Sequence, residues 1–244
     1  MVEVIRVTDT EDLVNRAAER FVDVARAATA PGGGINYDGV ARIVLTGGTA
    51  GIKLLEKVAG IGADLPWEKI HIFFGDERNV PVTHPESNEG QAREALLSRV
   101  AIPEDNIHGY GLEGLDAAAL AESAADYERV IDQFAPRGFD LHLLGMGYEG
   151  HINSLFPHTD AVREETRRVI PVLDSPKPPA ERATLTLPAV RSSQRVWLLV
   201  SGAEKAEAAA AVVGGASAED WPAAGATGAA ETLMFLADDA ATGI

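Results

Sequence analysis

Apolar residues recur along this chain in two alternating patterns, short continuous runs and stripes spaced by three and four positions. The clearest stripe comprises Leu13, Ala17, Phe21, Val24 and Ala28, a spacing that predicts an amphipathic helix. Helical patterns occur at residues 13–28, 52–59, 92–97, 120–134 and 203–213. Short apolar runs predict strands at residues 2–7, 42–46, 69–74, 139–144, 168–172, 183–187, 196–200 and 232–236.

This alternation favours a Rossmann-like α/β fold, in which helices cover both faces of a mainly parallel sheet. We expect residues 1–244 to form a single domain. The proline-rich residues 174–180 are too few to link two domains and could be a mobile loop. The alanine- and glycine-rich residues 213–230 resemble a long surface loop.

The chain is acidic, with 37 acidic and 21 basic residues and a net charge of −16. This charge argues against nucleic acid, which is bound by neutralising its phosphates with Lys and Arg, and against anionic membrane surfaces. The absence of cysteine excludes disulfides and thiolate chemistry. No secretory signal and no apolar run of about 18 residues is visible, so we expect a cytoplasmic protein without a membrane span.

A glycine turn follows the predicted strand at 42–46 and opens a helix. Gly47, Gly48 and Thr49 stand where unpaired backbone N–H groups and the positive end of the helix dipole suit a phosphate. The alternative is a plain strand-to-helix turn with Thr49 as its N-cap. The turn is not a Walker A loop, because it lacks the Gly-Lys-Ser/Thr ending and Lys53 lies too far along.

Three charged residues, Asp76, Glu77 and Arg78, follow an apolar strand and are predicted to form a polar loop. Charges at the carboxyl end of a buried strand lie where open α/β sheets bind ligands. A guanidinium group suits bidentate recognition of an anion. The alternative is a solvated turn that contains an internal Asp–Arg pair.

A second glycine turn, with Gly145, Gly147 and Gly150, matches the G-x-G-x-x-G spacing after a predicted strand, and Glu165 follows as in a dinucleotide site. The context argues against a dinucleotide, because His151 follows at once where a long helix is expected. His151 could instead take a proton from water at neutral pH, although a lone histidine is more often structural. The remaining histidines show no paired metal-ligand spacing, so we expect no metal: His71, His84, His108, His142 and His158.

Taken together, these motifs resemble the 6-phosphogluconolactonase family over most of the chain. The matching segments are LTGGTAG at 45–51, GDERNVP at 75–81, Ser87-Asn88, GMGYEGHINSLFP at 145–157, RATLTLP at 182–188 and SGAEK at 201–205. The resemblance implies a hydrolase that opens 6-phospho-D-glucono-1,5-lactone to 6-phosphogluconate in the oxidative pentose phosphate pathway, without a cofactor. It also implies functional coupling to glucose-6-phosphate dehydrogenase.

The resemblance also implies roles for individual residues. His151 would be the general base, Arg78 a substrate-contacting arginine, and Asp76 an acidic partner near the sugar hydroxyls or the catalytic centre. The turn at 47–49 would hold the phosphate. The remaining residues expected to bind substrate are Asn88, Gly145, Gly147, Glu149, Arg182 and Lys205.

Some of these residues could instead have no direct role at the site. Glu77 and Asn88 could be purely structural, and Arg182 and Lys205 could be ordinary surface residues. The sequence departs from the family pattern at two pairs of positions. Tyr148-Glu149 stands where proline-aspartate is common, which puts the orienting role of Glu149 in doubt, and Ile152-Asn153 stands where threonine-alanine is common.

Two other functions need to be weighed against lactone hydrolysis. The related glucosamine-6-phosphate deaminases carry a glutamate beside the histidine, in an I-A-F-N-E-P run. Here that position is Phe156, whose ring cannot assist proton transfer. A non-catalytic sugar-phosphate-binding regulator is the second alternative, in which we would expect the histidine to be replaced or a DNA-binding module to be added.

Overall fold

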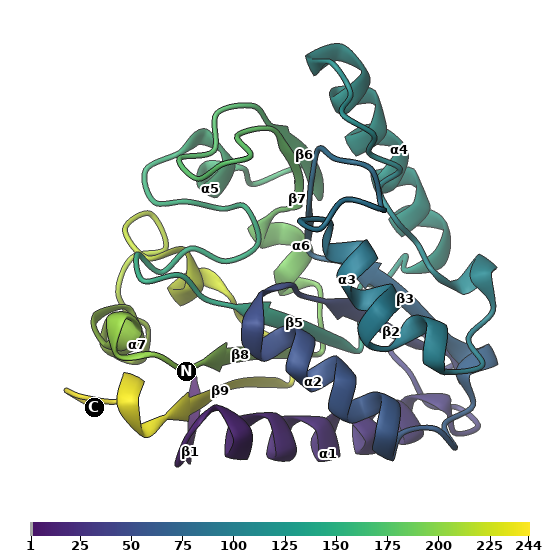
Figure 1. The fold of residues 1–244 in the computed structure, drawn as a ribbon, viewed down its shortest axis with the longest axis horizontal. Coiled ribbons are helices and arrows are strands. Elements are labelled where there is room, and N and C mark those ends of the chain that lie inside the picture. Colours follow the sequence, from purple (N-terminus) through teal and green to yellow (C-terminus); the bar gives the residue numbers. More distant parts are fainter. Residues whose placement is uncertain (1) are drawn as a thin grey trace.

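The computed structural model describes residues 2–244 (Figure 1). Its strands are β1 (Glu3–Val7), β2 (Ala41–Leu45), β3 (Ile70–Phe74), β4 (Asp76–Arg78), β5 (Leu141–Gly145), β6 (Val169–Val172), β7 (Arg182–Leu185), β8 (Arg195–Val200) and β9 (Glu231–Ala237). Its α-helices are α1 (Thr10–Thr29), α2 (Gly48–Ile61), α3 (Asn88–Ala95), α4 (Ala117–Phe134), α5 (Asp160–Arg163), α6 (Leu187–Arg191) and α7 (Ala206–Val213).

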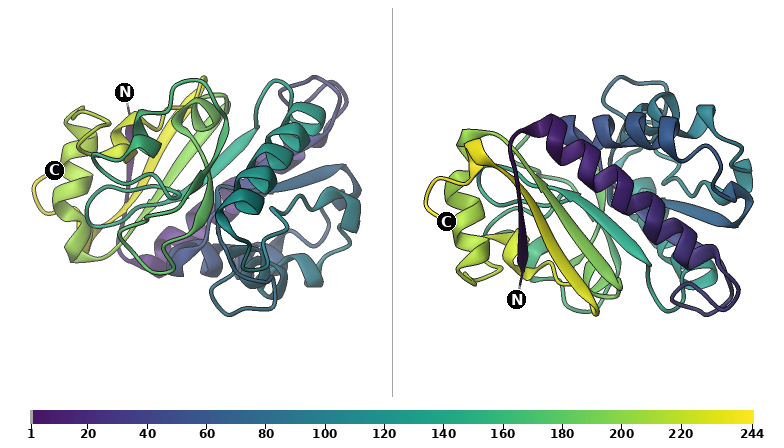
Figure 2. Two further views of the ribbon diagram at one scale, coloured as in Figure 1. Left: turned by 90° about the horizontal axis from the view of Figure 1, so that it is seen from above. Right: turned by 90° about the horizontal axis from the view of Figure 1, so that it is seen from below.

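A six-stranded parallel sheet, in the order β1-β9-β8-β5-β2-β3, forms the centre of the molecule. Alternate residues of its strands point to opposite faces, and both faces are buried. On β8, Trp197 and Leu199 join the core that contains the apolar sides of α1 and α2. Val196 and Leu198 join the core on the α7 side. Figure 2 shows α1 running across one face of this sheet. The predicted parallel sheet with helices on both faces is therefore confirmed.

A second, antiparallel sheet in the order β4-β7-β6 packs beside α4 and was not predicted. Asp76–Arg78, expected to be a loop, is its strand β4. Gly75 links the two sheets, since its N–H donates to Leu45 in β2 (3.1 Å) and its carbonyl accepts from Leu185 in β7 (2.8 Å). The prediction of a loop was wrong because these three charged residues pair with a strand more than a hundred positions away.

The segment 213–230 also differs from its prediction as a surface loop. Its second half contains a short 3-10 turn at Pro222–Gly225, in which Pro222 and Ala223 are buried. The N–H of Ala223 donates to the carbonyl of Gly150 (2.9 Å), so this segment closes over the glycine turn next to His151. A further 3-10 turn, Ala203–Lys205, precedes α7 within the predicted helix at 203–213.

The order of strands places the functional segments at one edge. β8, β5, β2 and β3 are neighbours and parallel, so the turns that follow them meet at their carboxyl ends. The chain passes from β2 to β3 on one side and later returns to β5 on the other side of β2, and ligands bind at such reversals in open α/β sheets. Among residues 2–244, every helix is too short or too polar to cross a bilayer.

Candidate active site

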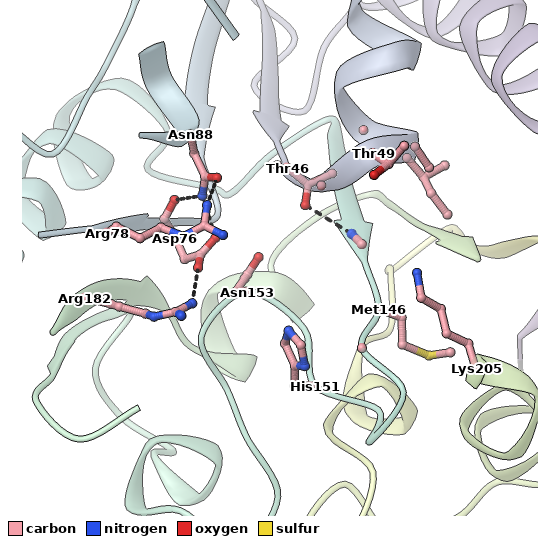
Figure 3. Close-up of a pocket in the computed structure, with 17 residues that line it drawn as sticks. Thr46, Thr49, Asp76, Arg78, Asn88, Met146, His151, Asn153, Arg182 and Lys205 are labelled. Atoms are coloured by element: carbon pink, nitrogen blue, oxygen red, sulfur yellow. Dashed lines mark hydrogen bonds and ion pairs between the residues drawn. The ribbon is translucent and has the colours of Figure 1, made fainter. Parts of the chain in front are cut away.

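A cavity of about 160 Å³ opens at these strand ends (Figure 3). Arg78, Asp76 and Arg182 lie on one side of it, Lys205 and Thr49 on the other, and His151 lies between them. The complete lining is Thr46, Gly47, Gly48, Thr49, Ala50, Gly51, Asp76, Arg78, Asn88, Gly145, Met146, Gly147, His151, Asn153, Arg182, Leu199 and Lys205.

The turn at 46–49 presents the start of α2 to this cavity. The N-cap of α2 is Gly47, and no side chain accepts a hydrogen bond from the first turn, so Thr49 is not a cap. Gly48 has a φ of 81°, a conformation that favours glycine, and is exposed. Thr46 accepts a hydrogen bond from the N–H of Gly145 (3.1 Å), which ties this turn to the glycine turn after β5. The open helix start therefore has the features of an anion site.

The buried carboxylate of Glu77 joins β4 to the start of α3 at the corner between them. One oxygen accepts from the backbone N–H groups of Arg78 and Asn88 (both 2.8 Å), and the other from the Ser87 hydroxyl (2.9 Å) and the Glu89 N–H (2.8 Å). Burial raises the pKa of Glu77, against the effect of these hydrogen bonds. Glu77 does not line the cavity and orients the residues on either side of it.

Asn88 and Arg78 form the cavity wall that this corner supports. The Asn88 amide nitrogen donates to the Asp76 carboxylate (3.0 Å) and carbonyl (2.8 Å), and the Asn88 amide oxygen accepts from Arg78. The other oxygen of Asp76 accepts from the hydroxyl of Ser154 (2.7 Å). Within residues 2–244, Arg78 has no ion-pair partner and its buried Nε lacks a hydrogen-bond acceptor. The guanidinium of Arg78 is thus available to an anionic ligand.

Arg182 is buried, and most of its donors point at the protein. It donates to backbone carbonyls of residues 177–179 at 2.9 to 3.3 Å and to the hydroxyl of Ser154 at 3.4 Å. It also lies 3.9 Å from the Asp76 carboxylate. Arg182 therefore fixes the proline-rich loop at 174–180 to the cavity wall, a role that sequence reasoning did not anticipate.

His151 stands in the glycine turn with its ring stacked on Phe156, at 4.5 Å between centroids. A Cβ at Gly147 would overlap the imidazole ring and the carboxylate of Glu149, so glycine is required there for space. Glu149 Oε2 lies 3.2 Å from Nδ1 of His151. Glu149 is not part of the cavity lining and contacts the ring from outside it.

The surroundings of His151 disfavour protonation of its ring. Burial, reinforced by the positive charge of Lys177, lowers the pKa of His151, against smaller opposing effects of Glu149 and Asp76. Burial also acts to raise the pKa of Glu149, but its hydrogen bonds to Lys177 and His151 outweigh burial and leave that pKa lowered. A neutral imidazole beside an ionised carboxylate is the state that a general base requires.

Lys205 supplies the cation on the side of the cavity opposite Arg78. It lies at the end of the short turn between β8 and α7, and burial lowers its pKa, against the effects of Glu204 and Asp239. In the part of the chain that the structure describes, Lys205 has no ion pair.

The structure thus brings almost all of the sequence-predicted residues to one cavity, with Glu149 directly behind His151. Sequence reasoning missed Thr46, Asn153 and Lys177. Thr46 adjoins the glycine turn and could have been included on position alone. Asn153 has a φ of 47° and is buried, and its amide has no hydrogen-bond partner among the described residues. Lys177 lies in the proline-rich loop, where only the three-dimensional structure reveals its contact with His151.

Comparison with known proteins places these features in context. The sequence model described as glucosamine-6-phosphate isomerases/6-phosphogluconolactonase matches residues 8–235. A Mycobacterium tuberculosis protein named 6-phosphogluconolactonase is 50% identical, with 96% of this chain and 94% of that protein covered. A Streptomyces coelicolor protein of the same name is 40% identical, with 96% and 91% covered.

Solved structures show the same architecture. A 6-phosphogluconolactonase from Thermotoga maritima superposes with a TM-score of 0.82 at 27% identity, covering 98% of this chain and all of that one (100%). A monomeric glucosamine-6-phosphate deaminase superposes with a TM-score of 0.79 at 21% identity, covering 99% of both chains. The second likeness shows the fold alone.

Proposed function

The chain belongs to the glucosamine-6-phosphate isomerase/6-phosphogluconolactonase family, and we propose that His151 is the general base of its reaction. That reaction is the hydrolysis of 6-phospho-D-glucono-1,5-lactone to 6-phospho-D-gluconate, a step of the oxidative pentose phosphate pathway, in keeping with relatives matched over nearly their whole length. The observation that supports the proposed base is that His151 shares a cavity with Arg78, Lys205 and an uncapped helix start.

The phosphate of the substrate would lie at the start of α2. Backbone N–H groups of the first helical turn, the hydroxyl of Thr49 and the ammonium of Lys205 converge on this side of the cavity. These groups offset the unfavourable field of a chain with a net charge of −16. Holding the phosphate here would orient the lactone ring against His151, so remote binding energy would position the reacting carbon.

His151 would then remove a proton from a water molecule as the water oxygen bonds to the lactone carbonyl carbon. Glu149 Oε2 lies 3.2 Å from Nδ1 of His151, so in this proposal Nδ1 would carry the proton in the catalytic tautomer and Nε2 would receive the proton from water. Negative charge develops on the carbonyl oxygen, where Arg78 or backbone N–H groups of the glycine turns would stabilise it. The bond to the ring oxygen then breaks, and the imidazolium returns its proton to that oxygen.

Asp76 and Asn88 would act at the sugar. The Asp76 carboxylate is fixed by Ser154 and Asn88, and its oxygens retain lone pairs that could accept bonds from ring hydroxyls. In this proposal Arg182 holds Asp76 and the loop in place, and its contact with the ligand is secondary.

Phe156 opposes a deaminase reaction. The phenyl ring stacks on His151 and is buried. No carboxylate can therefore act from this position, where the deaminase pattern has its glutamate. A non-catalytic sugar-phosphate binder is opposed by the arrangement of His151 itself, which lines the cavity and whose lowered pKa suits proton transfer.

We further propose a cytoplasmic location and functional coupling to glucose-6-phosphate dehydrogenase through the lactone that the two enzymes share. The cysteine-free sequence suits a reducing compartment, and its acidic charge disfavours nucleic acid as a partner. Measuring lactone turnover in a coupled assay, with and without the dehydrogenase at high concentration, tests whether the coupling involves more than the shared metabolite.

The proposed base is tested by following proton release from freshly made lactone. We expect His151→Asn to lower kcat by about 10²–10⁴-fold, because general-base assistance is lost. The matched control is His158→Asn, whose ring is largely exposed and lies outside the cavity, and which should keep wild-type turnover. Near-normal kcat in a folded His151→Asn protein would refute the assignment. Ammonia release from glucosamine 6-phosphate, measured in parallel, tests the deaminase alternative.

A further inference from the structure

The ammonium group of Lys177 contacts both members of the His151–Glu149 pair. Its Nζ lies 2.7 Å from Glu149 Oε1 and 3.4 Å from Nδ1 of His151. It also lies 4.6 Å from the ring centroid of Tyr148, within the range of a cation–π contact. Tyr148 and Glu149 are the residues at which this chain departs from the proline-aspartate pattern, so both departures adjoin the same lysine.

The backbone that carries Lys177 is fixed. The N–H of Ser175 donates to the carbonyl of Ala180 (3.0 Å), which closes the proline-rich loop on itself. The guanidinium of buried Arg182 donates to the Lys177 carbonyl (3.0 Å) and to the Pro179 carbonyl (2.9 Å). The proline-rich loop at 174–180 is thus hydrogen-bonded to Arg182 of β7, and Lys177 reaches from it to the histidine.

The hydrogen-bond donors and acceptors around Nδ1 of His151 indicate the role of Lys177. Its ammonium only donates hydrogen bonds, so the 3.4 Å contact with Nδ1 is a hydrogen bond only when Nδ1 is unprotonated, and Lys177 cannot accept the Nδ1 proton that the catalytic tautomer carries. Glu149 Oε2 lies 3.2 Å from Nδ1 and has no hydrogen-bond partner among the described residues, so it is available to that proton, while Oε1 is bound by Lys177. Lys177 therefore restrains a carboxylate whose stem is one methylene longer than that of aspartate, and turns its free oxygen towards His151.

The charge of Lys177 acts on the ring as well. Two charged groups contact His151, namely Lys177 and Glu149. The other charged groups that share its cavity are Asp76, Arg78, Arg182 and Lys205. Among the described residues, Lys177 is the cation in direct contact with the ring, and it opposes protonation of the imidazole, whereas the carboxylates of Glu149 and Asp76 favour it. Lys177 thus has two separate effects: restraint of Glu149 favours the tautomer in which Nδ1 carries the proton, and repulsion of a second positive charge disfavours protonation of Nε2.

We propose that Lys177 is a positioning residue that holds Glu149 against His151 and sets the pH below which the imidazole stops acting as a base. This inference rests on the proposed role of His151 as general base. It assigns a function in the reaction to a lysine that does not line the substrate cavity.

The test is the pH dependence of kcat/KM for lactone hydrolysis, measured for the wild type, Lys177→Met, Lys177→Arg and Glu149→Gln. On the acid limb of this profile, kcat/KM falls with decreasing pH as His151 is protonated. Loss of the cation should move the acid limb of Lys177→Met to higher pH by about one unit. Glu149→Gln should move it to lower pH, and Lys177→Arg should stay close to the wild type. The Lys177 side chain is about one-third exposed (34%), so its replacement should leave the fold intact. Titration of the His151 ring by NMR should show the same shifts without substrate.

Two outcomes would overturn the inference. An unchanged acid limb in Lys177→Met, together with no further shift when Lys177→Met is added to Glu149→Gln, means that the lysine does not act on the histidine. A raised KM with an unchanged limb means that Lys177 binds substrate. His151→Asn, assayed alongside, separates this inference from the proposed function. If that variant keeps its turnover, the general base itself is wrong, whereas a dead His151→Asn with an unshifted Lys177→Met defeats only the role of Lys177.

Discussion

The position of one imidazole ring depends on a glycine that makes no hydrogen bond to it. His151 lies against Gly147 on one side and against Phe156 on the other, with Glu149 beside Nδ1. A side chain at position 147 would occupy the space of the ring and of the carboxylate. The backbone of Gly147 does not have a positive φ, so its requirement for glycine is one of space.

Gly147→Ala should therefore impair catalysis much more than folding. The added methyl group must displace His151 or Glu149, and a displacement of about 1 Å can cost about 10²-fold in rate. We expect kcat to fall by about that factor, with a nearly unchanged thermal unfolding temperature. Gly60→Ala is the matched control, because a Cβ there meets open space on α2 and should leave kcat unaltered. Equal kcat values in the two variants would contradict this account of Gly147.

At the scale of elements, a buried carboxylate fixes the geometry of the corner between β4 and α3. The Glu77 carboxylate accepts four hydrogen bonds, three of them from backbone N–H groups. These bonds fix the start of α3, where Asn88 points back to Asp76 and Arg78. An anion at a helix start also interacts favourably with the helix dipole. Glu77 is therefore structural, and its effect on the site is indirect.

Glu77→Gln should destabilise the protein without removing any cavity residue. The amide keeps one acceptor oxygen and turns an NH₂ group towards two buried donors, and each unsatisfied donor costs about 1–3 kcal/mol. We expect the free energy of unfolding in urea to fall by about 2–6 kcal/mol. Glu86→Gln, an exposed change in the same connection, should have little effect. If both variants unfold at the same urea concentration, the carboxylate does not hold this corner.

This corner also shows where prediction from sequence ends. The spacing of apolar residues correctly predicts the helix α1 and the strands β2, β3, β5 and β8. Each of these elements buries one or both of its faces, so its apolar residues recur at the spacing of a helix or in a short continuous run. Asp76–Arg78 has no such pattern, and it forms β4 only by pairing with Arg182–Thr184. Local periodicity in the sequence does not reveal the pairing of two segments that are so far apart.

At the scale of the whole molecule, the site residues were predictable wherever they follow a parallel strand. The carboxyl ends of β2, β3, β5 and β8 must meet in such a sheet, so motifs at these four places converge. The contact of Lys177 with His151 was not predictable, because it depends on the path of a proline-rich loop anchored by Arg182.

The sheet that converges on the site also buries histidines that the reaction does not use. His142 on β5 is completely buried, and burial lowers its pKa to about 3, slightly opposed by neighbouring Asn153. His108 contacts His71 through ring nitrogens 2.9 Å apart, and burial, together with His71, lowers the pKa of His108 to about 4. Both histidines bind protons in the unfolded chain at higher pH than in the folded protein.

Acid should therefore destabilise the folded protein well above the pH at which its carboxylates are protonated. As pH falls from about 6.5 to 4, the unfolded chain gains these protons and the folded protein does not, so each such histidine removes about 1.4 kcal/mol of stability per pH unit. His142→Leu should reduce the slope of unfolding free energy against pH by that amount, measured in urea between pH 6 and 4.5. Its ring nitrogens have no hydrogen-bond partner among residues 2–244, so an apolar replacement leaves no buried donor unsatisfied. The matched control is the replacement of exposed His84 by glutamine, which removes a histidine from the surface. If His142→Leu has the same slope as the wild type, His142 binds its proton equally well in the folded protein and in the unfolded chain.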